Sequence, residues 1–308
     1  MNQTKKNSLF GVVMLLLTAF IWGVAFVAQS AGMESVEAFT FNGIRTLLGA
    51  AVLTPYILLR DRQKRKNMTA EQIGCEKKIS RRTVLCGIPL GVVFCAASNF
   101  QQFAFYDSSS GKIAFITALY IFFVPLLGLF IGKRVSWLTW ICVAVGFVGL
   151  YFLCVSPGVS GGISFGDILA FICSILFAVQ ILMVERFTDA DGVKLSWMQL
   201  IVSGVLSTVL MFVFETPQIG NILSAAVPIL YAGILSCGLA YTFQIIGQKH
   251  TEATVASLIM CMESVFGVLA GAILLQEKLS GREIFGCAVM FAAIVASQFS
   301  EKFAQRKK

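Results

Sequence analysis

Two charged side chains stand inside long apolar stretches and are the residues of this sequence best suited to chemistry. Glu263 lies about ten residues into one stretch, roughly 15 Å deep at a helix rise of about 1.5 Å per residue. An ionised carboxylate without a partner is costly at that depth in a membrane. We therefore expect Glu263 either to line a central cavity, where it binds a cationic substrate group or carries a coupling proton, or to join helices through buried hydrogen bonds.

Arg45 is the second charged side chain of this kind. It lies about nine residues from the end of another apolar stretch, so its guanidinium can reach a depth similar to that of Glu263. Three roles stay open for it. The first is to bind a substrate carboxylate through two parallel hydrogen bonds. The second is to pair with Glu263, and the third is to extend toward the membrane surface and anchor its helix.

A further group consists of polar or amphipathic side chains inside apolar stretches. Single residues of this type often join helices, at about 0.6 kcal/mol each. As a set they predict a moderately polar cavity suited to an amphipathic solute. Together with Glu263 and Arg45, the predicted substrate-binding or coupling residues are Trp22, Gln29, Asn99, Gln102, Tyr120, Gln180, Tyr241 and Gln244.

Two of the apolar stretches contain proline or glycine residues at positions that affect helix geometry. Pro125 removes one helix hydrogen bond, so we expect a hinge there. Gly128 and Gly132, like Gly267 and Gly271, form the G-x-x-x-G pattern, which predicts close packing between helices.

Other chemistries lack the residues that they need. His250 is the one histidine, so a histidine-based metal cluster is excluded. Residues 158–162 spell G-x-S-x-G, but a serine hydrolase also needs a histidine and an acid within reach, and His250 is predicted on the opposite membrane face. The sequence contains no Walker motif. We expect no catalytic residues, no metal and no cofactor.

The composition requires a membrane protein. Of 308 residues, 57% are hydrophobic and 13% charged, whereas a soluble domain has about 25% charged residues. A helix that crosses a bilayer needs about 20 apolar residues. The predicted fold is an all-α integral membrane protein with ten transmembrane helices. They are expected at residues 9–29, 36–59, 84–105, 113–131, 137–155, 165–184, 195–214, 222–246, 254–275 and 284–300.

The basic residues predict the orientation of these helices. With the N-terminus inside, 20 of the 24 Lys and Arg fall on the cytoplasmic side, so both termini are predicted to be cytoplasmic. This distribution accounts for the net charge of +8 and excludes a nucleic-acid partner. We expect the longest break, residues 60–82, to be a flexible cytoplasmic loop.

Weak internal similarity divides the chain into two halves. An offset of 151 pairs Gln29 with Gln180, and an offset of 142 pairs Gln102 with Gln244. A repeat of five spans must insert its second copy in the opposite direction, as in many secondary transporters. The predicted units are residues 1–155 and 165–308, joined by a Gly/Ser linker at 156–164.

Short motifs in both halves follow the pattern of a known family. In the first half they are Trp22-Gly23, Phe41 with Arg45, Thr117-Ala118-Leu119-Tyr120 and Phe123-Val124-Pro125-Leu126-Leu127. In the second half they are Ala240-Tyr241-Thr242-Phe243-Gln244, Met262-Glu263-Ser264-Val265-Phe266 and Glu277-Lys278-Leu279-Ser280. Together they resemble the EamA family of the drug/metabolite transporter superfamily over nearly the whole chain. The departures are Ser264 in place of a proline, Gln276 in place of a glycine and Lys133-Arg134 in place of Gly-Glu.

The resemblance implies two inverted five-helix repeats and transport of small metabolites such as amino acids or their derivatives, often by export. The predicted function is therefore a secondary transporter in the cytoplasmic membrane that works by alternating access. Its expected partners are a small-molecule substrate and the lipid bilayer, with proton coupling left open and no obligate protein partner. The alternative is a multidrug exporter of hydrophobic cations that uses Glu263 as its anionic site.

Overall fold

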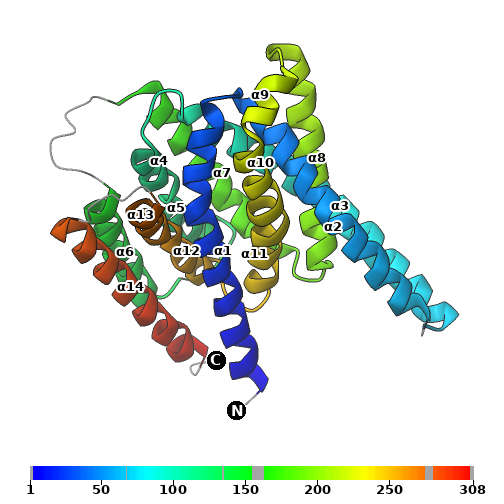
Figure 1. Cartoon of the computed structure of the whole chain (residues 1–308). Helices are drawn as coiled ribbons and strands as arrows, with labels where there is room; N and C mark the ends of the chain where they lie inside the picture. Colours follow the sequence, from blue (N-terminus) through cyan, green and yellow to red (C-terminus); the bar gives the residue numbers. More distant parts are fainter. Residues whose placement is uncertain (1–2, 67, 134, 155–162, 275–279, 306–308) are drawn as a thin grey trace.

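The computed structural model describes residues 3–66, 68–133, 135–154, 163–274 and 280–305. Within these ranges the chain is helical and has no strand, which confirms the predicted all-α fold (Figure 1). The first half contains α1 (Gln3–Met33), α2 (Ala38–Lys66), α3 (Ala70–Ala104), α4 (Ser110–Thr117), α5 (Tyr120–Phe130) and α6 (Trp137–Cys154). The second half contains α7 (Phe165–Arg186), α8 (Gly192–Phe214), α9 (Ile219–Ser224), α10 (Ala226–Leu230), the π-helical segment η1 (Tyr231–Ala240), α11 (Tyr241–Gln248), α12 (Ala253–Met260), α13 (Met262–Leu274) and α14 (Gly281–Gln305).

Eight stretches of the described residues are helical, long and apolar enough to cross a membrane. They are formed by α1, α2, α3, α4 with α5, α7, α8, α10 through α11, and α12 with α13. α6 is a shorter apolar helix, and α14 lies where the last span is expected. The protein is therefore a multi-pass membrane protein whose helices lie where the sequence predicts spans.

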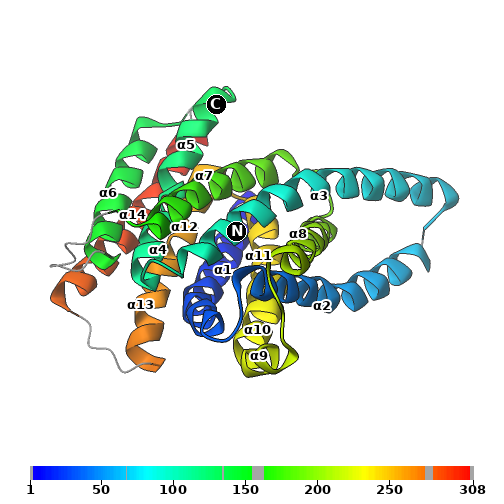
Figure 2. The same cartoon turned by 90° about the horizontal axis from the view of Figure 1, so that it is seen from above.

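The same helix contacts occur again when each helix is replaced by the equivalent helix of the other half. α3 packs on α7 and α8, and the eighth span, formed by α10, η1 and α11, packs on α1 and α2. Likewise, α1 packs on α12 and α13, while α7 packs on α4 and α5. α2 pairs with α8, and α6 pairs with α14 at one edge of the bundle (Figure 2). Each of these contacts thus has a counterpart in the other half, as expected for a two-repeat fold.

The fourth and ninth spans are each interrupted near the middle. The breaks lie at residues 118–119, between α4 and α5, and at Cys261, between α12 and α13. They lie against each other, because the Cys261 thiol is 3.7 Å from the carbonyl oxygen of Ala118. Interrupted helices release backbone groups from the helical hydrogen-bond pattern, which many transporters use at their binding sites.

The π-helical segment η1 gives the eighth span a second kind of irregularity. Both of its ends are bound to α1. The Tyr231 hydroxyl donates to the carbonyl of Ile21 at 3.0 Å, and the Thr18 hydroxyl donates to the carbonyl of Ala240 at 3.1 Å. π-Helical turns occur frequently at functional sites.

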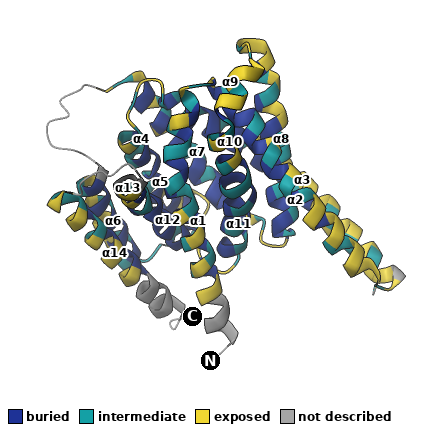
Figure 3. Cartoon of the chain, viewed as in Figure 1, coloured by how far each residue is buried: buried dark blue, intermediate teal, exposed yellow. Residues whose placement is uncertain are grey.

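The expectation of a flexible loop at residues 60–82 is wrong. α2 continues to Lys66 and α3 begins at Ala70, so the two helices extend beyond the bundle as an exposed hairpin (Figure 3). The segment is rich in Lys, Arg, Gln and Glu, which favour helix even where nothing packs against them. Thr69 and Gln72 form a capping box at the start of α3.

The two glycine patterns have different roles. Gly267 packs against the backbone of Gly23 in α1, which confirms close helix packing at that pattern. Gly132 instead has a φ of +80° and follows the end of α5, where the N–H of Lys133 donates to the carbonyl of Gly128 at 3.0 Å. Close packing is wrong there, because these glycines form a Schellman turn.

The predicted boundary between the halves lies largely outside the described residues. Residues 155–162 of the Gly/Ser segment are not among them, so the linker and the domain limits stay predictions. Ser164, at the end of this segment, caps α7 together with Asp167. 

Candidate functional site

A small cavity lies among buried side chains from both halves of the bundle. Its volume of about 30 Å³ is enough for about two water molecules and too small for a metabolite. Eight of the ten predicted site residues line it. The lining residues are Trp22, Ala25, Phe26, Gln29, Arg45, Gln101, Thr117, Tyr120, Phe177, Gln180, Ile181, Ser236, Tyr241, Gln244 and Glu263.

Glu263 enters the cavity directly after the break in the ninth span. Its carboxylate accepts a hydrogen bond from the Tyr120 hydroxyl at 3.1 Å, and Tyr120 is the first residue after the break in the fourth span. Only 4% of Glu263 is exposed. The two interrupted helices therefore present one phenol and one carboxylate to the same enclosed space.

A glycine in α1 allows this close arrangement. A Cβ atom at Gly23 would lie 2.6 Å from the carbonyl oxygen of Glu263 and 2.7 Å from the backbone nitrogen of Gly267. Both distances are too short for a real Cβ, and backbone atoms cannot turn away. The bare backbone at Gly23 thus sets how closely α13 and its carboxylate approach α1.

Arg45 lies in the cavity wall and is bound within its own half. Its guanidinium donates to the Gln29 side-chain oxygen at 2.9 Å and lies 5.3 Å from the ring centre of Phe41. The described ion pairs within 4.0 Å do not include one between Arg45 and Glu263. With 3% exposure, Arg45 is also not extended toward the membrane surface.

The second half contributes paired amides. Gln244 donates to the side-chain oxygen of Gln180 at 3.0 Å, and Gln180 donates to that of Gln199 at 3.0 Å. All three side chains are buried. Gln180 and Gln244 thus form a neutral part of the cavity wall, while the side-chain nitrogen of Gln199 behind them has no hydrogen-bond partner.

Aromatic rings form much of the remaining wall. Trp22 packs on Tyr241 with ring centres 4.7 Å apart, and Tyr241 meets Phe94 at 4.5 Å. The indole N–H of Trp22 and the Nε–H of Arg45 are buried and have no protein acceptor. The site therefore holds two hydrogen-bond donors that a bound anionic group or water can engage.

Two predicted site residues lie outside the cavity lining. Asn99 belongs to a polar cluster of α2, α3 and α8, where it accepts from Asn42 at 2.9 Å and donates to Ser207 at 2.8 Å. Gln102 reaches only the backbone carbonyl of Gln29, at 3.5 Å. Sequence reasoning missed Gln101, Thr117 and Ser236, which line the cavity.

Pro125 lies inside α5, whereas the break in this span occurs at residues 118–119. α5 continues through Pro125, so a hinge at this residue stays a prediction. Among the described residues, no group of three His, Cys, Asp or Glu side chains is arranged to hold a metal ion.

Comparisons with known proteins agree with this architecture. The sequence profile of the EamA-like transporter family matches residues 9–155 and 164–297. An uncharacterized transporter of Archaeoglobus fulgidus is 24% identical over 91% of this chain and 83% of its own length. The uncharacterized inner membrane transporter YedA of Escherichia coli is 24% identical over 93% of this chain and 89% of its own. A protein of known crystal structure shares the fold, with a TM-score of 0.74, 17% identity, and coverage of 97% of this chain and 98% of that one.

Proposed function

Because the chain belongs to the EamA-like transporter family, we propose that it is a secondary transporter that exports small organic metabolites across the cytoplasmic membrane by alternating access. One observation carries the proposal. Glu263 and Arg45 line the same buried cavity without forming an ion pair with each other. A solute that carries both a cationic and an anionic group, such as an amino acid or a derivative, fits this pair of charges.

Hydrogen bonding supports the same substrate class. The unpartnered N–H groups of Trp22 and Arg45 suit a carboxylate, which accepts several hydrogen bonds. Glu263 suits an ammonium group, or carries a proton when the site is empty. Since the cavity volume is only about 30 Å³, the helices must separate to admit a solute. This requirement agrees with alternating access.

The experiment is counterflow into proteoliposomes that contain the purified protein, with amino acids, nucleosides, polyamines and cationic dyes tested in turn. We expect saturable exchange of a zwitterionic solute. Glu263→Gln should lower it about 100-fold and remove its pH dependence, because a buried charged contact contributes about 2–5 kcal/mol. Glu252→Gln, an exposed acid at the start of the same span, is the matched control and should transport normally.

A multidrug exporter of hydrophobic cations is the second candidate. Aromatic side chains favour it, because rings near a carboxylate attract organic cations. They are Trp22, Phe26, Tyr120, Phe177 and Tyr241. Exchange of dyes that depends on Glu263 but not on Arg45 would favour this candidate and contradict the zwitterion proposal.

We also propose that both termini and the hairpin of α2 and α3 face the cytoplasm, since most basic residues then lie inside. Cys75 is exposed on the hairpin and offers a direct test. A membrane-impermeant maleimide should label Cys75 in inverted vesicles and leave it unlabelled in intact cells. The opposite pattern would reverse the orientation.

A further inference from the structure

The hairpin that α2 and α3 form beyond the bundle has no role in the proposed transport site. We call residues 60–66 of α2 and 70–83 of α3 the arm. The arm leaves the bundle at a slant to α1 and reaches sideways (Figures 1 and 2). Between residues 60 and 82 the chain carries nine basic and three acidic residues. 

The basic residues of α3 continue the face that meets lipid. Lys77, Arg81, Leu85 and Ile88 follow one another at intervals of four, four and three residues, so they share one face of the helix. Leu85 and Ile88 are 59% and 42% exposed, as expected of apolar side chains in contact with lipid tails. The lipid-facing side of α3 thus becomes basic at the point where its apolar residues end.

α2 shows the same change at the corresponding place. Leu58 and Leu59 are 59% and 61% exposed. Arg62 and Lys66 follow on the same face, four and eight residues after Leu58, and both are exposed. Both helices therefore pass from the hydrocarbon to the headgroup region with basic side chains on the side that faces lipid.

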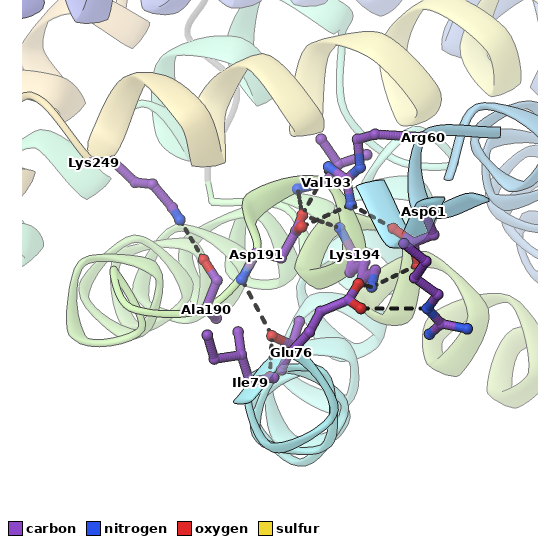
Figure 4. Close-up of polar contacts among 11 residues, drawn as sticks. Arg60, Asp61, Glu76, Ile79, Ala190, Asp191, Val193, Lys194 and Lys249 are labelled. Atoms are coloured by element: carbon purple, nitrogen blue, oxygen red, sulfur yellow. Dashed lines mark hydrogen bonds and ion pairs between the residues drawn. The ribbon is translucent and has the colours of Figure 1, made fainter. Parts of the chain in front are cut away.

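The opposite face of the arm is already bound to the second half (Figure 4). Arg60 forms an ion pair with Asp191 at 2.7 Å, and Lys194 forms one with Asp61 at 2.7 Å and one with Glu76 at 3.8 Å. Burial raises the pKa of Asp191, but the N–H of Lys194 and the Arg60 guanidinium outweigh this and lower it. Two of the three acids of the arm, Asp61 and Glu76, thus form ion pairs on this inner face.

Part of the arm is separated from the bundle by a cavity. A cavity of about 470 Å³ separates α2, α3 and the start of α8, with Lys64, Gln72, Ile79 and Lys194 among its lining residues. The described polar contacts of the arm with the second half include the ion pairs of Arg60, Asp61 and Glu76 and the hydrogen bond that Thr83 accepts from the N–H of Asp191.

We propose that the outer face of the arm binds the headgroups of anionic phospholipids in the adjoining leaflet. The charges of the two are complementary. The exposed cations of Lys77, Lys78, Arg81 and Arg62 lie at headgroup depth, where anionic lipids carry their negative charge. The lipid contact and the ion pairs to Asp191 and Lys194 occupy opposite faces of the same arm. The lipid composition therefore influences how the arm sits on the second half.

Native mass spectrometry of the purified full-length protein tests this inference. The protein in detergent is titrated with phosphatidylglycerol or with phosphatidylcholine, and the bound lipids are counted. We expect about tenfold stronger retention of phosphatidylglycerol. The variant K77Q/K78Q/R81Q should lose most of this preference, while K77R/K78R/R81K should keep it.

Two controls separate this site from other sources of charge. K5Q/K6Q/K302Q removes the same number of cations elsewhere on the predicted cytoplasmic side and should keep the preference. Inorganic phosphate in excess should not displace the lipid. Equal retention of the two lipids, an unaffected K77Q/K78Q/R81Q variant, or displacement by phosphate would each overturn the proposal, whatever the result of the transport assay.

Discussion

Two glutamines of the second half and their equivalents in the first half form different hydrogen bonds, although three of the four line the cavity. In the second half, Gln180 and Gln244 bind each other through their side-chain amides at 3.0 Å. Their equivalents in the first half do not pair in this way. Gln29 accepts a hydrogen bond from Arg45 at 2.9 Å, and Gln102 reaches only a backbone carbonyl.

One pair of equivalent positions differs in charge. Arg45 corresponds to Ser196 at the offset of 151 that relates Gln29 to Gln180. Ser196 forms a hydrogen bond with Thr242 at 3.0 Å and leaves the amide pair of its own half undisturbed. The first half thus has a buried cation bound to Gln29 where the second half has a neutral amide pair.

The largest effect is expected from Arg45→Ser, which makes the first half like the second. Loss of the buried cation should lower counterflow of a zwitterionic solute about 100-fold, because a buried charged contact contributes about 2–5 kcal/mol. Arg45→Lys keeps the charge but loses the planar guanidinium, and should recover only part of the activity. A fully active Arg45→Ser protein with normal thermal unfolding would mean that the difference between the halves has no role in transport.

Gly23→Ala is expected to have the next largest effect, on stability. The new methyl group would meet the backbone of Glu263 and Gly267, so the free energy of unfolding should fall by about 2 kcal/mol. Ser174 is the equivalent residue, and its hydroxyl bonds only to its own helix at Phe171. Ser174→Ala should change stability by less than about 0.5 kcal/mol. Unfolding in mixed detergent and SDS micelles measures both, and equal losses would contradict the assigned role of Gly23.

Double-mutant cycles with Gln→Leu compare the amides directly. Gln180 and Gln244 should be coupled by about 0.6–1 kcal/mol in the free energy of unfolding. Gln29 and Gln102 should be coupled by less than about 0.3 kcal/mol, since their side chains do not meet. Similar coupling in both cycles would show that the halves are more alike than their hydrogen bonds indicate.

Ser196→Ala should give the smallest change. It removes the hydrogen bond to Thr242 and should lower the free energy of unfolding by about 0.6 kcal/mol. Counterflow should stay within about twofold of the original rate. A large transport defect would instead place Ser196 in the substrate path and make the two positions functionally equivalent.

Hydrophobic stretches and charge distribution were sufficient to predict the helical spans and to single out Glu263 and Arg45. Depth along a helix follows from residue count, which explains why both residues reach one cavity. The direction in which a side chain points around the helix axis cannot be predicted from residue count in the same way. Asn99 and Gln102 turn away from the cavity lining while the adjacent Gln101 faces it, and a uniformly apolar span contains no pattern that distinguishes these directions.

Two features depend on tertiary contacts that the sequence pattern does not encode. The break at residues 118–119 has neither proline nor glycine, and is matched by the break at Cys261 that packs against it. The π-helix of η1 has the same composition as an ordinary span. The arm is a different case, because the helix propensity of its Lys, Arg, Gln and Glu residues is a local property that the sequence does contain.

The π-helix also determines how the cavity wall can move. Each hydrogen bond in a π-helix closes over one residue more than in an α-helix. Rewinding one turn of η1 as α-helix would therefore shift the register by one residue and turn Tyr241 and Gln244 about the helix axis. Tyr231 and the Ala240 carbonyl hold this winding through their bonds to α1. The contacts of α1 with both ends of η1 thus fix the register of Tyr241 and Gln244, which line the cavity.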